Sequence, residues 1–257
     1  MKKLIDAHIH LDHYEEESIS ELLESAEHIE ALISASFHLE SSKKNLALSK
    51  NYSKVKPAFG FHPEQPLPSE QELDELLNWM HTHQNEMVAV GEVGLPYYLR
   101  NEQKITQRQL GQYSELLETF IKHARDWEKP IVLHAVYDDA PVVCDLLEIY
   151  SVKNAHFHWF KGDDKTVSRM IENGYYISVT PDVVYEEEIQ QLVQSYPLKQ
   201  IMVETDGPWP FEGIFNGKMT HPNMMRESIK TIANIKNLPT EEVYRQIYFN
   251  TKCFFSI

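Results

Sequence analysis

Short apolar runs recur along the chain, separated by longer polar segments. Eight of them are candidate strands: residues 4–9, 31–37, 55–61, 87–93, 131–134, 154–158, 175–179 and 200–204. Each run is nearly continuously apolar rather than alternating, which is typical of parallel strands covered on both faces. The pattern therefore predicts a parallel sheet.

The segments between these runs carry apolar residues at helical spacing, as at Ile19, Leu22 and Leu23. The longest helical candidate covers residues 106–127. Strands and helices alternate, so the chain is predicted to be an α/β protein with a TIM-type (β/α)8 barrel. We expect one domain over residues 1–257, with extra C-terminal helices after residue 220.

The composition limits which molecules the protein surface is expected to bind. Hydrophobic residues make up 42% of the chain, which is enough for a sizeable core. The 24 Lys and Arg against 39 Asp and Glu give a formal net charge of −15, so the surface as a whole should repel nucleic acid and anionic membranes. We therefore expect no general nucleic-acid surface, and any phosphoester must be attracted locally, for example by bound divalent cations.

The two cysteines, Cys144 and Cys253, lie far apart in the sequence. This spacing predicts neither a disulfide framework nor a cysteine-rich zinc site, and it fits the cytoplasm. Charged residues interrupt the start of the chain before an apolar signal-peptide core can form. No apolar run approaches the length of about 18 residues that a membrane helix needs, so we expect no membrane association.

A histidine pair ends the first apolar run. His8 and His10 are two positions apart, so strand geometry points both imidazoles to the same side. Such a pair can bind one cation from a strand end. Taken alone, however, the pair is more typical of surface or hydrogen-bonded histidines.

Carboxylates end two other runs. Glu92 follows an apolar run, where a charge is costly unless it is paired with a cation or bound to a metal. Glu204 and Asp206 share strand parity at the end of the eighth run, with Asp206 nearer the mouth. We expect the deeper Glu204 to orient a ligand histidine, although it is also a natural partner for a buried cation or hydroxyl.

Two further histidines, His134 and His158, end the fifth and sixth runs. Each alone is more typical of a structural histidine than of a ligand, and the deeper His156 is expected to pack or hydrogen bond within its strand. Together, however, potential ligands end the first, fourth, fifth, sixth and eighth runs. The C-terminal ends of barrel strands bring such distant residues together, and barrel active sites lie there.

Six motifs in this order and spacing resemble one family. They are DAHIHLD, GFHPE, GEVGLPYY, PIVLH, HWFKG and VETDGPWP. From Asp6 to about Asn250 the chain is similar to the TatD-like metal-dependent hydrolases, within the amidohydrolase-like group. The resemblance implies two divalent metal ions, one held by His8, His10 and Asp206 and one by His134 and His158, with Glu92 bridging them. Zinc, manganese and magnesium all suit this set of ligands.

The resemblance also implies an activity. TatD-like deoxyribonucleases cleave phosphodiester bonds, so we expect stepwise removal of nucleotides from DNA ends by a water that bridges the metal ions. Asp206 would accept the proton of this water. His62, in GFHPE, would contact the substrate, and either His62 or a metal-bound water would assist the leaving group.

Three departures from the family pattern lie near the expected phosphate position. Pro96 stands where the family commonly has Asp, Val136 where it has Arg, and Lys161 where it has Ser. Valine cannot replace a bidentate arginine clamp on a phosphate. Lys161 would restore one positive charge for substrate binding. The identity of the ester is therefore more open than the metal site.

Two alternatives to a phosphodiesterase remain at this point. The same metal site could hydrolyse a small carboxylic ester, amide or lactone, because two cations can also polarise a carbonyl. The chain could instead be a catalytically silent binding protein, with a partner or base-stacking surface built from loop aromatic residues. These residues, which could equally be rim packing, are Trp159, Phe160, Trp209 and Phe211.

Overall fold

The computed structural model describes residues 3–257, and its strands form one eight-stranded parallel sheet in sequence order. The strands are β1 (Leu4–Ile9), β2 (Ile29–Ala35), β3 (Val55–Phe59), β4 (Ala89–Gly94), β5 (Ile131–His134), β6 (Ala155–Phe157), β7 (Tyr176–Val179) and β8 (Ile201–Val203). All eight predicted strands are present, which confirms the parallel sheet.

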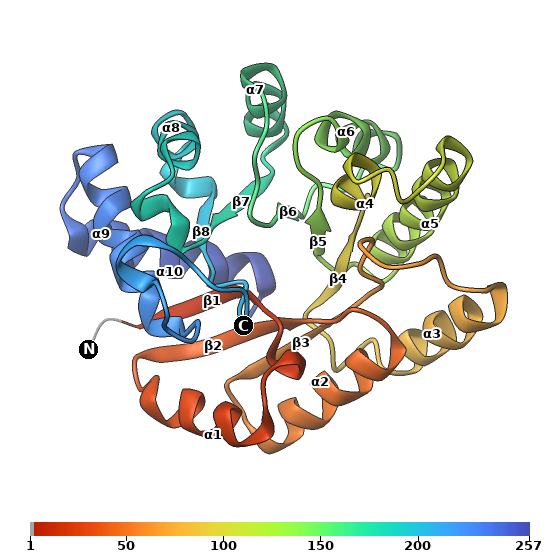
Figure 1. Ribbon diagram of the computed structural model, residues 1–257, viewed down its shortest axis with the longest axis horizontal. Helices are drawn as coiled ribbons and strands as arrows, with labels where there is room; N and C mark the ends of the chain where they lie inside the picture. Colours follow the sequence, from red (N-terminus) through yellow and green to blue (C-terminus); the bar gives the residue numbers. More distant parts are fainter. Residues whose placement is uncertain (1–2) are drawn as a thin grey trace.

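The sheet closes where β8 meets β1. The backbone N–H of Asp206 donates to the carbonyl of His8 at 2.9 Å, and the N–H of His10 donates to the carbonyl of Gly207 at 2.8 Å. Figure 1 shows the strands around the centre of the molecule with helices on the outside. The predicted TIM-type barrel is therefore confirmed.

Ten α-helices lie in the described part of the chain: α1 (Glu16–Ser25), α2 (Leu39–Asn51), α3 (Glu70–Thr82), α4 (Tyr97–Asn101), α5 (Gln107–Asp126), α6 (Asp139–Ile149), α7 (Asp164–Asn173), α8 (Glu187–Ser195), α9 (Met225–Lys236) and α10 (Thr240–Phe255). The longest is α5, as predicted, and α9 and α10 are the expected C-terminal helices. Thr106 caps α5 with Gln109 in a reciprocal capping box, which fixes where this helix begins.

Two apolar layers hold the barrel together. The larger layer lies between strands and helices, where α1 buries Ile19 and Leu22. The smaller layer alternates along the strands, as in Ile5 and Ala7 of β1, and therefore faces the barrel interior. Most of its members are small or β-branched, so they fill a narrow interior.

Helix α10 closes one end of this interior. Phe254 and Phe255 belong to the same buried cluster as Ile5, Ala7 and inward residues of β2, β3, β4, β5 and β8. We call this pair the aromatic floor. The remaining entrance to the barrel is the C-terminal end of the strands.

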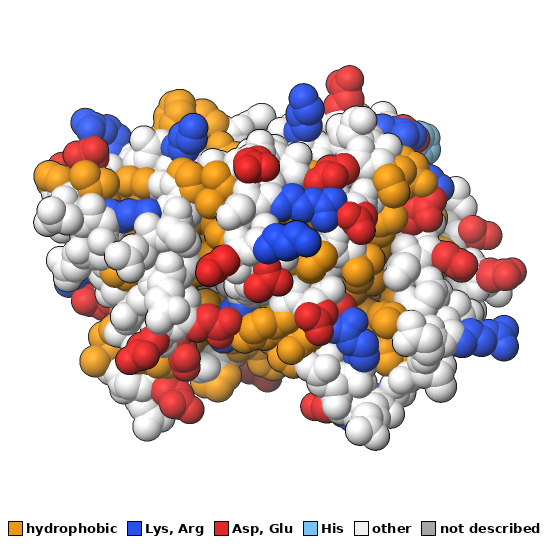
Figure 2. All heavy atoms as spheres, turned by 90° about the horizontal axis from the view of Figure 1, so that it is seen from above, with side chains coloured by type: hydrophobic (Ala, Val, Ile, Leu, Met, Phe, Trp, Pro, Cys, Tyr) orange, Lys and Arg blue, Asp and Glu red, His pale blue; other side chains and the backbone are white. Residues whose placement is uncertain are grey.

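The surface and the cysteines agree with the composition. Figure 2 shows a face on which acidic and basic side chains are interspersed without a continuous basic area. Cys144 and Cys253 are both free, as expected. Within residues 3–257, no helix combines the length and the apolar character needed to cross a membrane.

Candidate metal centre

The structure brings all six predicted metal ligands together at the C-terminal end of the barrel. His8 lies in β1, Glu92 in β4 and His134 in β5. His10 directly follows β1. His158 and Asp206 lie in the loops after β6 and β8. Each of the six residues is at most 8% exposed. Their role as ligands remains a prediction, but their convergence from five strands is a finding.

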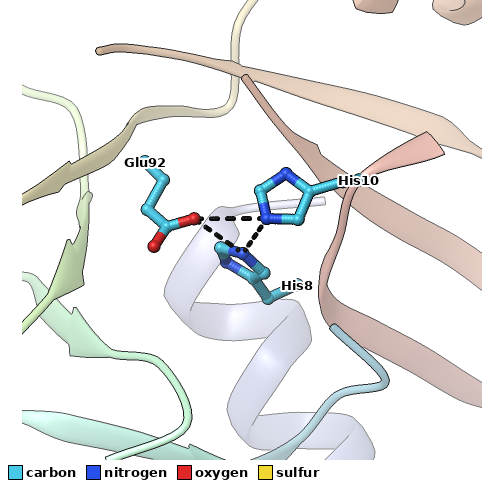
Figure 3. Close-up of side chains that lie close together, drawn as sticks. All are labelled: His8, His10 and Glu92. Atoms are coloured by element: carbon cyan, nitrogen blue, oxygen red, sulfur yellow. Dashed lines mark hydrogen bonds and ion pairs between the residues drawn. The ribbon is translucent and has the colours of Figure 1, made fainter. Parts of the chain in front are cut away.

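One oxygen of Glu92 faces the His8–His10 pair (Figure 3). Glu92 Oε2 lies 3.1 Å from His8 Nε2 and 3.3 Å from His10 Nε2, and these two nitrogens are 3.2 Å apart. Asp206 Oδ1 lies 3.4 Å from both nitrogens. Four ligands about 2.0–2.1 Å from a central ion are separated by about 3.3–3.4 Å in a tetrahedron. These five separations match that spacing, and His8, His10 and Glu92 lie close enough together to hold one ion.

The other oxygen of Glu92 faces a second set of imidazoles. Glu92 Oε1 lies 2.6 Å from His158 Nε2 and 2.8 Å from His134 Nδ1, and these two nitrogens are 3.3 Å apart. His62 Nε2 lies 3.2 Å from the same oxygen. Glu92 thus stands between two groups, as a bridging carboxylate would.

Hydrogen bonds within this cluster leave some buried polar atoms unsatisfied, and a bound cation would satisfy them. Glu92 Oε2 and Asp206 Oδ1 are buried and have no hydrogen-bond partner. Unsatisfied buried carboxylate oxygens are costly, and coordination to a cation would satisfy them. The mixed imidazole and carboxylate donors suit zinc or manganese, and the carboxylates also suit magnesium.

Hydrogen bonds fix the orientation of two imidazoles. His10 Nδ1 lies 3.1 Å from the carbonyl of Ala35, so Nδ1 carries a hydrogen, and in the neutral imidazole the lone pair of Nε2 faces the first group. His62 Nδ1 instead accepts the backbone N–H of Glu64 at 3.1 Å. In neutral His62 the hydrogen is therefore on Nε2, which points into the cluster.

Glu64 is a site residue that sequence reasoning missed. It accepts the backbone N–H groups of Tyr98 and Leu99, both at 2.8 Å. Its Oε1 lies 3.4 Å from Nε2 of His134, on the far side of this imidazole from Glu92. The only signal in the sequence is its position two residues after His62 in the motif GFHPE.

Glu204 lies behind His158, one pleat deeper than Asp206. It accepts the Trp159 N–H at 2.7 Å and the Ser178 hydroxyl at 2.5 Å, and its Oε1 is 3.7 Å from His158 Nδ1. His156 hydrogen bonds with Ser178 at 2.5 Å, deeper in the barrel. This arrangement agrees with the positions expected for both residues.

Asp6 joins the first strand to the last ligand loop. Its carboxylate accepts the N–H of Thr205 at 3.0 Å and the Thr205 hydroxyl at 2.5 Å. It also accepts the N–H of His8 at 3.3 Å. Burial raises the pKa of Asp6 to about 8. Asp6 thereby fixes the position of His8 relative to Asp206.

The electrostatics of the cluster centre on Glu92. Burial opposes its ionisation, but the nearby imidazoles of His158, His62 and His8 outweigh burial and hold its pKa well below the ordinary value. Burial, with the charge of His158, lowers the pKa of His8 to about 4. Burial acts in the same direction on His10, but the nearby carboxylates of Asp206 and Glu92 outweigh burial and raise its pKa to about 10. A cation binding here would displace a proton from His10.

A pocket of about 490 Å³ opens beside the two groups. Its lining consists of His10, Phe37, His62, Glu64, Tyr98, His134, Val136, His158, Trp159, Asp206, Trp209 and Pro210. Val136 is therefore at the pocket wall, where the family arginine was expected. Lys161 is not part of the lining and lies with its Nζ 5.9 Å from the centroid of the Trp159 ring. Its predicted contact with substrate remains a prediction.

The other singled-out residues are packed away from the pocket. Pro96 is buried immediately before α4. Phe160 is fully buried in the main core, and Phe211 packs in a small cluster with Phe215 and Trp159. Of the four loop aromatics, only Trp159 and Trp209 line the pocket.

Comparisons with known proteins agree with this architecture. The family described as TatD related DNase matches residues 5–256. An uncharacterized metal-dependent hydrolase of Haemophilus influenzae is 36% identical, over 99% of this chain and 100% of its own. Human deoxyribonuclease TATDN3 is 29% identical, over 93% of this chain and 90% of its own.

Solved structures show the same fold. The Escherichia coli TatD homologue YJJV superposes with a TM-score of 0.88 at 24% identity, covering 100% of this chain and 99% of its own. A TatD family hydrolase of Entamoeba histolytica superposes with a TM-score of 0.85 at 20% identity, with 98% of each chain covered. The family match over nearly the whole chain is the deciding observation. This chain belongs to the TatD family of metal-dependent hydrolases.

Proposed function

We propose that this protein is a phosphodiesterase that uses two divalent cations and acts at the ends of DNA, as a deoxyribonuclease of the exonuclease type. The observation that supports the proposal is the position of Glu92, whose two oxygens face separate groups of ligands. The name of the human relative, a deoxyribonuclease, supports DNA as the substrate. The pair of cations would activate water and stabilise negative charge on the phosphoryl oxygens.

The protein side chains have distinct tasks in this proposal. His8, His10 and Asp206 would hold one cation, His134 and His158 would hold the other, and Glu92 would be shared between them. Asp206 Oδ1 lies 3.4 Å from Nε2 of both His8 and His10, so this carboxylate is placed to accept the proton of the attacking water. Burial lowers the pKa of His62, so neutral His62 donates a hydrogen bond from Nε2 to the leaving oxygen.

The pocket wall favours a second candidate as well. None of its described lining residues is Lys or Arg, so a neutral carboxylic ester, amide or lactone would meet no unpaired cationic side chain. This candidate uses the same ligands, with the carbonyl oxygen in place of a phosphoryl oxygen.

A substrate panel separates the candidates. Purified protein loaded in turn with zinc, manganese and magnesium is offered single-stranded DNA, RNA, bis-p-nitrophenyl phosphate, an aryl acetate and a lactone. We expect turnover of the phosphodiesters, loss of it on chelation and recovery on readdition of metal. Turnover of only the ester or lactone would replace the first candidate with the second, and inactivity on the whole panel would contradict both.

A further inference from the structure

Aromatic side chains form much of the pocket wall beside the ligand groups. Four of them, Phe37, Tyr98, Trp159 and Trp209, line the pocket together with Val136 and Pro210. Lys and Arg are absent from the lining within the described chain. The wall therefore offers flat apolar faces and no cationic side chain to a substrate held at the cations.

Two of these rings are held rigidly. Trp159 donates from its backbone N–H to Glu204 at 2.7 Å and from its indole Nε1–H to Asp182 at 2.6 Å. The Phe37 ring stacks on His62, with centroids 4.1 Å apart and planes within 7°. Rings fixed in this way need little further ordering when a ligand binds.

Trp209 is the wall residue with a large exposed ring next to a predicted ligand. It is 42% exposed, while its backbone N–H donates to the carbonyl of Asp206 at 3.3 Å and its carbonyl accepts the hydroxyl of Thr220. The backbone thus holds the indole at the mouth of the pocket, and Tyr98 is another exposed lining ring, at 49%. Large exposed aromatic residues at a pocket mouth are typical of ligand contacts.

Two basic residues that lie two positions after lining residues do not replace the arginine expected at position 136. Lys161 lies over the Trp159 ring rather than in the pocket lining, and Arg100 is paired with the buried Asp139. Glu64 adds a carboxylate to the lining. A substrate with several phosphates would therefore gain little beyond the phosphate held at the cations.

We propose that this pocket binds a planar, uncharged ring of the substrate, of the nucleobase type, against Trp209, so that the terminal nucleotide is recognised through its base and the rest of a polyanionic chain contributes little. This inference rests on the proposed phosphodiesterase function and adds the part of the substrate that is recognised. The affinity comes from stacking, which tolerates any base, and charge recognition is left to the cations.

Binding of two product-like probes tests the proposal without using activity. Titration calorimetry on the metal-loaded protein compares thymidine monophosphate with deoxyribose phosphate, which carries the same phosphate and sugar without a base. We expect the base to improve Kd at least about tenfold, the size of one stacking contact. Raising the salt from about 50 to 200 mM should change the Kd of thymidine monophosphate by less than about threefold.

Three variants assign the effect to one ring. Trp209→Ala should reduce the preference for the base to within about threefold, while Trp209→Phe, which keeps a ring, should retain most of it. Ile214→Ala is the matched control, because Ile214 is 54% exposed in the same loop but does not line the pocket. Equal Kd values of the two probes on the unchanged protein, or a preference that survives Trp209→Ala, would overturn the proposal.

Failure of the binding test and failure of the substrate panel can be told apart. If the protein cleaves phosphodiesters but binds the two probes equally, the phosphodiesterase function is supported and the base-binding role of the pocket is contradicted. If the protein prefers the base-bearing probe but cleaves no phosphodiester, the base-binding role of the pocket is supported and the phosphodiesterase function is contradicted.

Discussion

The Oε1 atom of Glu64 lies 3.4 Å from Nε2 of His134. The opposite nitrogen of this imidazole, Nδ1, lies 2.8 Å from Glu92. A carboxylate on the Nε2 side of the imidazole favours a hydrogen on Nε2, which leaves the lone pair of Nδ1 free for a cation. Glu64 is itself held by two backbone N–H groups at the start of α4.

This relationship predicts a loss of metal affinity in Glu64→Ala. The affinity for one of the two cations should fall by about 10- to 100-fold, since loss of such a partner frees the imidazole to rotate. Competition with a chromophoric chelator measures it. Glu115→Ala, an exposed change on α5, serves as the control, and equal affinities in the two variants would rule out the positioning role.

Glu92→Gln tests the bridge. An amide offers one oxygen where the carboxylate offers two, so we expect the metal content of the purified protein to fall from two ions per chain to one or none. The kcat/KM for phosphodiesters should fall by at least about a thousandfold. Elemental analysis and the same kinetic assay check the two results. Two retained ions would show that Glu92 does not bridge.

Val136→Arg tests whether the missing clamp limits phosphate binding. Val136 is 4% exposed and lines the pocket, so a guanidinium there would reach a phosphate at the cations. We expect Kd for thymidine monophosphate to improve about tenfold and to become salt-dependent. Val136→Met, which adds length without charge, is the control. An unchanged Kd with unchanged salt dependence would place the phosphate elsewhere.

The aromatic floor should contribute strongly to stability. Phe255 is 3% exposed inside the barrel, so Phe255→Ala should lower the free energy of unfolding by about 3 kcal/mol through lost burial and a residual cavity. Phe249→Ala on the same helix, at a ring that is 59% exposed, should change it by less than about 0.5 kcal/mol. Urea unfolding compares the two, and similar losses would contradict the assignment.

A carboxylate away from the metal centre predicts how stability depends on pH. Glu30 on β2 accepts Lys252 Nζ and the Tyr248 hydroxyl from α10, both at 2.8 Å, and pairs with Lys3 at 2.8 Å. Hydrogen bonds from Lys252 and Lys3 lower its pKa from 4.5 to about 2. The folded pKa lies below the unfolded one, so the stabilisation is complete above about pH 4.5 and disappears as the pH falls through 2.

Glu30→Gln should therefore lower Tm at neutral pH, and the difference from the unchanged protein should shrink as the pH falls below 4.5. Thermal unfolding followed by circular dichroism over this range checks the prediction. Glu24→Gln, an exposed change on α1, is the control. A difference in Tm that does not depend on pH would show that charge is not the cause.

The barrel and its six potential ligands were predictable because both depend on local pattern. Continuous apolar runs mark covered strands, and residues that end such runs, like His134 and Asp206, must gather at one end of a barrel. The common direction of His8 and His10 followed from strand parity. Strand ends differed by up to two residues, for instance at β2, where polar and apolar residues mix.

What could not be predicted depends on contacts distant in sequence. Glu64 lies in a loop without periodicity, and its two N–H donors belong to a short helix more than 30 residues later. In the sequence, Asp6 lies within an apolar run, and only the fold shows that its carboxylate accepts the hydroxyl of Thr205. Phe160 and Trp209 look alike as loop aromatics, but only the fold buries one and exposes the other.

The aromatic floor also bears on how the chain is made. Phe254 and Phe255 come after all eight strands in the sequence, yet they pack against Ile5 and Ala7 near its beginning. During synthesis, the strands therefore leave the ribosome before the residues that seal their interior. The nascent barrel keeps an unsealed apolar lumen until α10 emerges, which is the interval in which a chaperone would find a surface to hold.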